Sequence, residues 1–165
     1  MNVLLSVLVG VIQWNAGALT FHSRMHRPTA FQTLEDSTVQ VTAQPQKPAE
    51  ALVWTTIDSV PILDTTQTLQ FEFQGLTPGI HLRIGIFFQV QGSQDYYTID
   101  RTVLLDTAWS TIEIPLRGAK KVFGSNFPHA LSMFGNADLI LIFSNPMAEP
   151  FVWKIRTISL VPSKS

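Results

Sequence analysis

The sequence predicts an all-β fold: an antiparallel β-sandwich of the jelly-roll type, preceded by a hydrophobic N-terminal helix. From residue 51 onward, short segments rich in β-branched and aromatic residues are separated by turn sequences. In the segment 106–116, apolar and polar residues alternate after Trp109, which is the period of a strand with one face in water. Pro115 ends this strand because it has no N–H to donate to a neighbour. Residues 1–21 carry no charged side chain, which sets them apart from the rest.

This hydrophobic leader, residues 1–21, has three interpretations. A helix of this length would span about 31 Å at roughly 1.5 Å per residue, close to the ~30 Å apolar core of a membrane. We therefore expect a membrane anchor, and Arg24 and Arg27 after it place the C-terminal domain on the cytoplasmic side. Alternatively, Ala16-Gly17-Ala18 is the cleavage site of a signal peptide, and the domain is periplasmic or extracellular. The third interpretation is an ordinary buried helix.

Residues 22–50 are predicted to form a polar linker with one possible strand at 39–43. His22 and His26 have the four-residue spacing of a helical metal site. No carboxylate follows at ligand spacing, and Pro28 ends any helix soon afterwards. Polar residues exposed to solvent are the simpler interpretation.

Residues 51–162 are predicted to be the β-sandwich domain. Residues 117–134 interrupt the pattern, and Pro128 could begin a short helix there. The expected strands are 51–58, 68–74, 81–91, 96–105, 109–115, 139–143 and 152–160.

Composition excludes several functions. The net charge is −1 with no basic stripe, so we expect no nucleic-acid partner. There is no cysteine, which excludes disulfides, thiol catalysis and zinc–thiolate sites. The sequence contains neither G-x-S-x-G nor H-E-x-x-H, and Glu72 and Glu113 alternate with apolar neighbours as solvent-facing residues do. We therefore expect no catalytic residue, no cofactor and no metal.

A candidate binding surface follows from two pairs of adjacent aromatic residues, Phe87-Phe88 and Tyr96-Tyr97. Neighbouring side chains of a strand point to opposite faces, so one member of each pair leaves the core. A glycan site predicts that the outward rings lie exposed in a groove with polar neighbours, whereas a protein interface or the linker would cover them. The outward face carries Arg83, Phe87, Gln89, Tyr96, Thr98 and Asp100.

Five segments in order, 69–73, 82–86, 96–100, 109–116 and 152–160, resemble the galactose-binding-like jelly rolls. That group includes carbohydrate-binding modules and the complex I intermediate-associated-protein domain. The resemblance covers a little over half of the chain and implies a scaffold for sugar binding or assembly, without choosing between them. It implies a core position for Trp109. Calcium-binding members often carry an Asp in the closing strand, where this chain has Trp153-Lys154-Ile155-Arg156, so a structural calcium is not expected.

Together these features predict a non-enzymatic interaction or assembly module, an accessory subunit tethered to a membrane protein complex. Its partners would be the other subunits of that complex. The alternative is an exported carbohydrate-binding module with a cleavable signal peptide and a glycan ligand.

Overall fold

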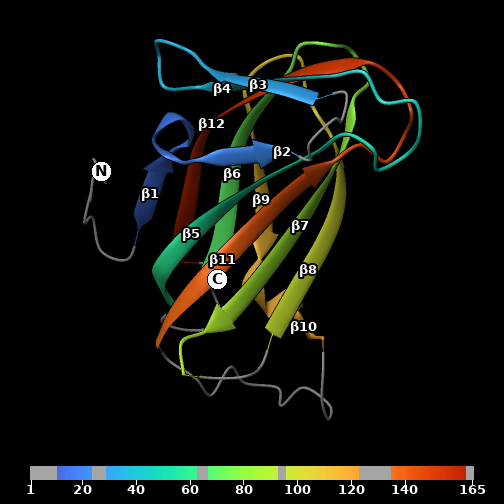
Figure 1. Ribbon diagram of the computed structural model, residues 1–165. Coiled ribbons are helices and arrows are strands. Elements are labelled where there is room, and N and C mark those ends of the chain that lie inside the picture. The colour runs from blue at the N-terminus through green and yellow to red at the C-terminus, as the bar shows by residue number, and fades with distance from the viewer. Residues whose placement is uncertain (1–10, 24–28, 63–66, 93–95, 123–134, 163–165) are drawn as a thin grey trace.

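The computed structural model describes residues 11–23, 29–62, 67–92, 96–122 and 135–162, which form two antiparallel sheets packed face to face (Figure 1). Sheet A has the order β3 (Thr29–Thr33), β4 (Val39–Ala43), β12 (Phe151–Pro162), β6 (Gln67–Gly75) and β9 (Ser110–Pro115), with β1 (Ile12–Asn15) also paired to β12. Sheet B has the order β10 (Lys120–Lys121), β8 (Tyr96–Leu104), β7 (His81–Val90), β11 (Gly135–Ser144), β5 (Leu52–Ile62) and β2 (Phe21–Ser23).

The core lies between the sheets and is centred on aromatic rings. Phe143 of β11 projects from sheet B between three rings of sheet A. Its ring centroid lies 6.1 Å from that of Phe71, 5.8 Å from that of Phe73 and 5.5 Å from that of Trp153. All four side chains are fully buried, and they fix the inner faces of β6, β11 and β12. In β12 the alternation is interrupted between Ile155 and Ile158, where the pairing with β6 shifts in register.

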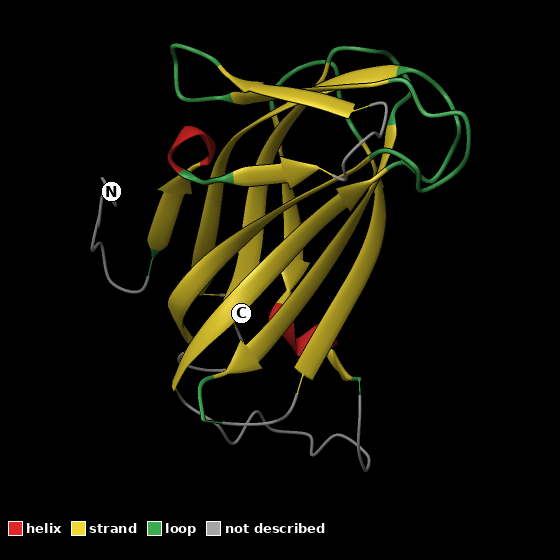
Figure 2. Ribbon diagram, in the orientation of Figure 1, coloured by secondary structure: helices red, strands yellow, loops and turns green. Residues whose placement is uncertain are grey.

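The expectation of a helix over residues 1–21 is wrong for the part that the structure describes. Residues 12–21 form β1, one 3₁₀ turn called η1 (Ala16–Ala18) and the start of β2 (Figure 2). β1 pairs with β12 and β2 with β5, and Ala16 and Phe21 are buried in the core. A short apolar run has the same composition in a helix and in a strand, and here pairing with two long strands decides between them. No helix among the described residues is long and apolar enough to cross a membrane.

Residues 22–50, expected as a linker, contribute β2, β3 and β4 to the two sheets. β4 has the expected bounds, and Val39, Val41 and Ala43 face the core. Among the described strands, β3 pairs with β4 alone, along the edge of sheet A. His22 lies exposed in β2 with its ring stacked on Trp54, at 5.5 Å between centroids.

Between residues 51 and 162, every expected strand is present within a few residues of its expected bounds. The expected helix at 128–134 lies outside the described residues. Trp109 is not in the core: it is half-buried before β9, and the Arg156 guanidinium carbon lies 4.5 Å from its ring centroid. β9 lies at the edge of sheet A, a position that suits Pro115 because proline has no N–H to donate.

Candidate functional site

The outer face of sheet B brings the six candidate residues together on β7 and β8. Ile84, Ile86 and Phe88 of β7 point into the core, and so do Tyr97 and Ile99 of β8. The alternate residues therefore point outward, as the strand pattern predicted. The register places Phe87 opposite Thr98 and Gln89 opposite Tyr96, while Arg83 and Asp100 lie nearby on the same two strands.

Four of the six candidates line a hollow, called here the apolar hollow, of about 220 Å³. Its floor is Gly85, flanked by Phe87 and by Ile142 of β11. A Cβ atom at Gly85 would lie 3.6 Å from Cε2 of Phe87 and 3.7 Å from Cβ of Ile142. The absence of a side chain at this position therefore keeps the floor open between two apolar groups. The complete lining is Ala49, Leu52, Arg83, Gly85, Phe87, Thr98, Asp100, Ile142 and Ser144.

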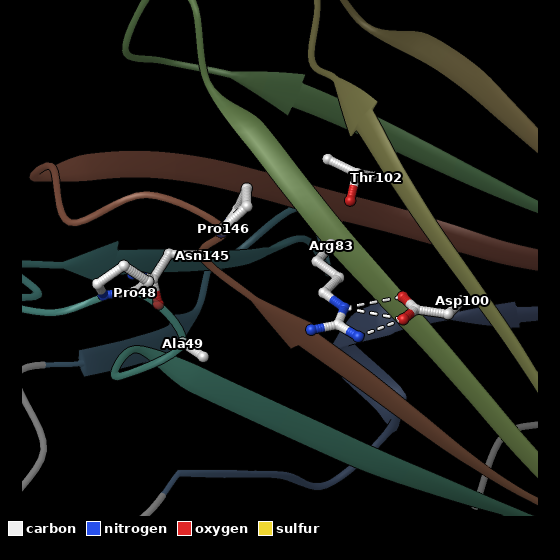
Figure 3. Close-up of a pocket in the computed structure, with 7 residues that line it drawn as sticks. All are labelled: Pro48, Ala49, Arg83, Asp100, Thr102, Asn145 and Pro146. Atoms are coloured by element: carbon white, nitrogen blue, oxygen red, sulfur yellow. Dashed lines mark hydrogen bonds and ion pairs between the residues drawn. The ribbon is translucent and has the colours of Figure 1, made fainter.

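A second hollow of about 420 Å³, called here the polar hollow, adjoins the first toward the loops that follow β4 and β11 (Figure 3). The two hollows share Ala49, Arg83 and Asp100, so they are adjacent parts of one depression. The polar hollow is lined by Pro48, Ala49, Arg83, Asp100, Thr102, Asn145 and Pro146.

An ion pair between Arg83 and Asp100 lies where the two hollows meet. Nε of Arg83 donates to both carboxylate oxygens, at 2.9 and 3.0 Å, and Nη2 also donates to Asp100. These hydrogen bonds hold the pKa of Asp100 below its usual value and raise that of Arg83. About half of each side chain remains exposed. The pair therefore offers a ligand both acceptors and donors, while its two charges offset each other.

Tyr96 and Gln89 lie farther along β7 and β8, outside both hollows. Tyr96 is 44% exposed and Ile140 of β11 is 40% exposed, so apolar surface continues beyond the apolar hollow. The sequence did not identify the contributions of β11, β5 and β2, because only the folded register brings these strands into the same sheet face as β7. One row across the face reads Asp100, Gly85, Ile142, Trp54 and His22.

The outer face of sheet A carries an ion pair between β12 and β6 and a polar contact between β6 and β9. Nε of Arg156 donates to Glu72 at 2.9 Å, and the Thr157 hydroxyl donates to the same carboxylate. The hydrogen bond from Arg156 is the main cause that lowers the pKa of Glu72. Gln70 donates to Glu113 at 2.9 Å. Within the described part of the chain, no three acidic or histidine side chains meet in a way that could hold a metal ion.

Comparison with solved structures identifies the fold. CtCBM11 matches with a TM-score of 0.62 and 13% identity, over 98% of this chain and 100% of that chain. The family 11 carbohydrate-binding module from Clostridium thermocellum, in complex with a β-1,3-1,4-mixed-linked tetrasaccharide, matches with a TM-score of 0.51 and 14% identity, over 99% and 94%. BiXyn10A CBM1 matches with a TM-score of 0.57 and 10% identity, over 92% and 96%.

The chain has the fold of carbohydrate-binding modules. This agrees with the resemblance found in the sequence, and at 10–14% identity the likeness concerns the fold alone. No family model matches the sequence, and no curated protein matches it either.

Proposed function

We propose that this protein is a carbohydrate-binding module whose glycan ligand lies on the outer face of sheet B. The observation that carries the proposal is the apolar hollow, where the half-buried ring of Phe87 stands beside the Arg83–Asp100 pair. A pyranose ring has apolar C–H faces and a rim of hydroxyl groups, so it needs both kinds of contact at one place. The fold supports the same assignment, because several similar structures are carbohydrate-binding modules.

The charges of the site favour a neutral glycan. The residues that line the two hollows carry one positive and one negative charge, Arg83 and Asp100, and these are paired. An acidic sugar would have to compete with Asp100 for the guanidinium group and would lie close to its carboxylate. Hydroxyl groups can instead donate to the carboxylate and accept from the Nη1 edge of Arg83, which is directed away from Asp100.

The shape of the site favours a chain over a single sugar. The row from Asp100 to His22 crosses five strands, which places its ends about 19 Å apart at about 4.8 Å between strands. Ile142 lines the apolar hollow, and Trp54, opposite it in this row, continues the apolar surface beyond the hollow. The first ligand to test is a β-1,3-1,4-linked glucan, because a module of the same fold was solved with such a tetrasaccharide.

The test is retention on immobilised neutral polysaccharides, followed by titration calorimetry with soluble oligosaccharides. We expect Phe87→Ala to weaken binding at least about tenfold, a loss of about 1.4 kcal/mol. Glu72→Ala on the outer face of sheet A is the matched control and should bind as the wild type does. The proposal fails if no neutral glycan in the panel is retained, or if both variants lose binding equally.

The accessory-subunit role, the membrane tether and the side of the membrane stay predictions. The half-buried Phe87 and the exposed Tyr96 could also contact a partner protein, since aromatic residues are frequent at interface centres. Purification of the native protein from membranes with a mild detergent, followed by identification of co-purifying proteins, tests this role. Recovery of the protein alone, and without residues 1–18, would contradict the tether.

A further inference from the structure

The strongest structural feature beside the proposed site is the buried side chain of Asn145, directly after β11. It is 1% exposed and lies between two loops. Its Oδ1 accepts a hydrogen bond from the Ala51 N–H at 2.8 Å. Its Nδ2 donates to the carbonyl oxygens of Lys47, at 3.2 Å, and Met147, at 2.6 Å. The amide therefore fixes the loop before β5 to the loop after β11, two segments that are far apart in the chain.

The backbone of Asn145 strengthens the same connection. Its carbonyl accepts from the Ala49 N–H at 2.8 Å, and its N–H donates to the Ala51 carbonyl at 3.3 Å. Ala49 has a φ of 58°, in the left-handed region that alanine rarely occupies, so the contacts around it hold it there. The Glu50 carboxylate closes the same loop by accepting from the N–H groups of Gln46, at 2.6 Å, and Lys47, at 3.2 Å.

This fixed loop, residues 46–51, forms one wall of the candidate site. Ala49 lines both hollows, and Pro48 lines the polar hollow. Figure 3 shows Pro48, Ala49 and Asn145 on one side of the polar hollow and the Arg83–Asp100 pair on the other. Because the two hollows share Ala49, Arg83 and Asp100, a chain that occupies both hollows would lie beside this wall and the ion pair. The position of this wall relative to the ion pair therefore depends on the buried amide of Asn145, which holds the loop through Ala51 and Lys47.

We propose that Asn145 is a positioning residue that fixes the 46–51 wall, and that this wall makes the site select unbranched glycan chains over chains with side-chain sugars. The inference rests on the proposed glycan function. A buried amide with all its partners in place holds a loop in one conformation, whereas a loop without it samples wider positions. A side-chain sugar needs that extra width next to Arg83 and Asp100, and an unbranched chain does not.

The test measures a ratio of affinities, because a purely structural defect would weaken all ligands together. The probes are a linear β-1,3-1,4-linked tetrasaccharide and a β-1,4-linked glucan oligosaccharide that carries α-linked xylose side chains, titrated into the full chain. We expect Asn145→Ala to lower the linear-to-branched affinity ratio roughly tenfold, equivalent to about 1.4 kcal/mol. The double variant Pro48→Gly with Ala49→Gly keeps Asn145 and should lower the same ratio, so the test remains decisive if Asn145→Ala does not fold.

Asp36→Ala is the control, because it removes a turn hydrogen bond to Thr38, 2.7 Å long, from the β3–β4 hairpin of sheet A. It should leave the ratio unchanged. The inference is overturned if Asn145→Ala and the double variant leave the ratio at its wild-type value, even when glycan binding itself is strong. If the wild type binds neither probe nor any other neutral glycan, the proposed function fails and the inference fails with it.

Discussion

Replacing Gly85 by alanine separates ligand binding from folding more sharply than any other single change at this site. The new Cβ would lie 3.6 Å from Phe87, 3.7 Å from the Ile142 Cβ and 3.8 Å from the Ile142 carbonyl, all ordinary van der Waals distances. The strand therefore accepts the methyl group without a clash. Alanine also restricts the unfolded chain, so the free energy of unfolding should rise by about 0.5–1 kcal/mol.

The same methyl group would fill the floor of the apolar hollow, where we expect a sugar ring to lie. Inserting one methyl group into a fitted contact costs roughly 1–3 kcal/mol, which corresponds to about a five- to 150-fold rise in Kd. Titration calorimetry measures Kd, and thermal unfolding should show a Tm higher by roughly 1–4 °C for a chain of this size. We therefore expect Gly85→Ala to be more stable than the wild type and to bind glycan less tightly.

Gly75→Ala is the matched control, because its Cβ would lie 3.1 Å from the Leu105 Cβ and 3.3 Å from the Asp106 carbonyl. Those contacts are tight, so this variant should lose stability and keep its glycan affinity. If Gly85→Ala bound glycan as tightly as the wild type, the apolar hollow would not be the ligand site. If it unfolded more readily than the wild type, the packing around β7 would differ from that described.

The remaining predictions concern the N-terminal strand, sheet A and pH. Gly17→Ala would place a Cβ 2.7 Å from the Ser37 carbonyl oxygen, so the free energy of unfolding, measured in urea, should fall by about 1–3 kcal/mol; unchanged stability would mean that residues 12–18 do not pack on the fold. Arg156→Ala removes the ion pair with Glu72 and the contact with Trp109, and should lower the free energy of unfolding by less than about 1.5 kcal/mol without changing glycan affinity. Weaker glycan binding by this variant would indicate that the ligand binds to sheet A and not to sheet B. Because Arg83 lowers the pKa of Asp100 below 3.8, the contribution of this carboxylate to stability is present above that pH and is lost as the pH falls through the lowered pKa. Urea midpoints of wild type and Asp100→Asn should therefore differ near neutral pH and converge in acid, and a constant difference at all pH values would refute this.

The faces of the strands could be predicted from the sequence because they depend on a local pattern. Alternation alone placed Phe87, Thr98 and Asp100 outward and their neighbours inward. The position of β11 beside β7 is a long-range pairing that no local pattern encodes, so Ile142 could not be identified as part of the site. Asn145 was missed for a related reason, because its structural role consists of hydrogen bonds to a loop that lies nearly one hundred residues earlier in the chain.

The N-terminal segment shows where local pattern is insufficient. The apolar residues before Phe21 suit a helix and a strand equally well, and the choice depends on the free edges that β12 and β5 offer. The environment of the Trp109 side chain could not be predicted from the local pattern either. Its place in the sequence suggested the core, but a cation from β12, Arg156, covers its ring on the outer face of sheet A.

The most direct test of the glycan site is a nuclear magnetic resonance titration of the labelled protein with a β-1,3-1,4-linked tetrasaccharide. We expect the backbone amide signals of β7, β8, β11 and the 46–51 loop to shift in a saturable manner. Signals of β6, β9 and β12 in sheet A should stay in place. Saturable shifts confined to sheet A, or no shifts with this and other neutral oligosaccharides, would contradict the proposed glycan site.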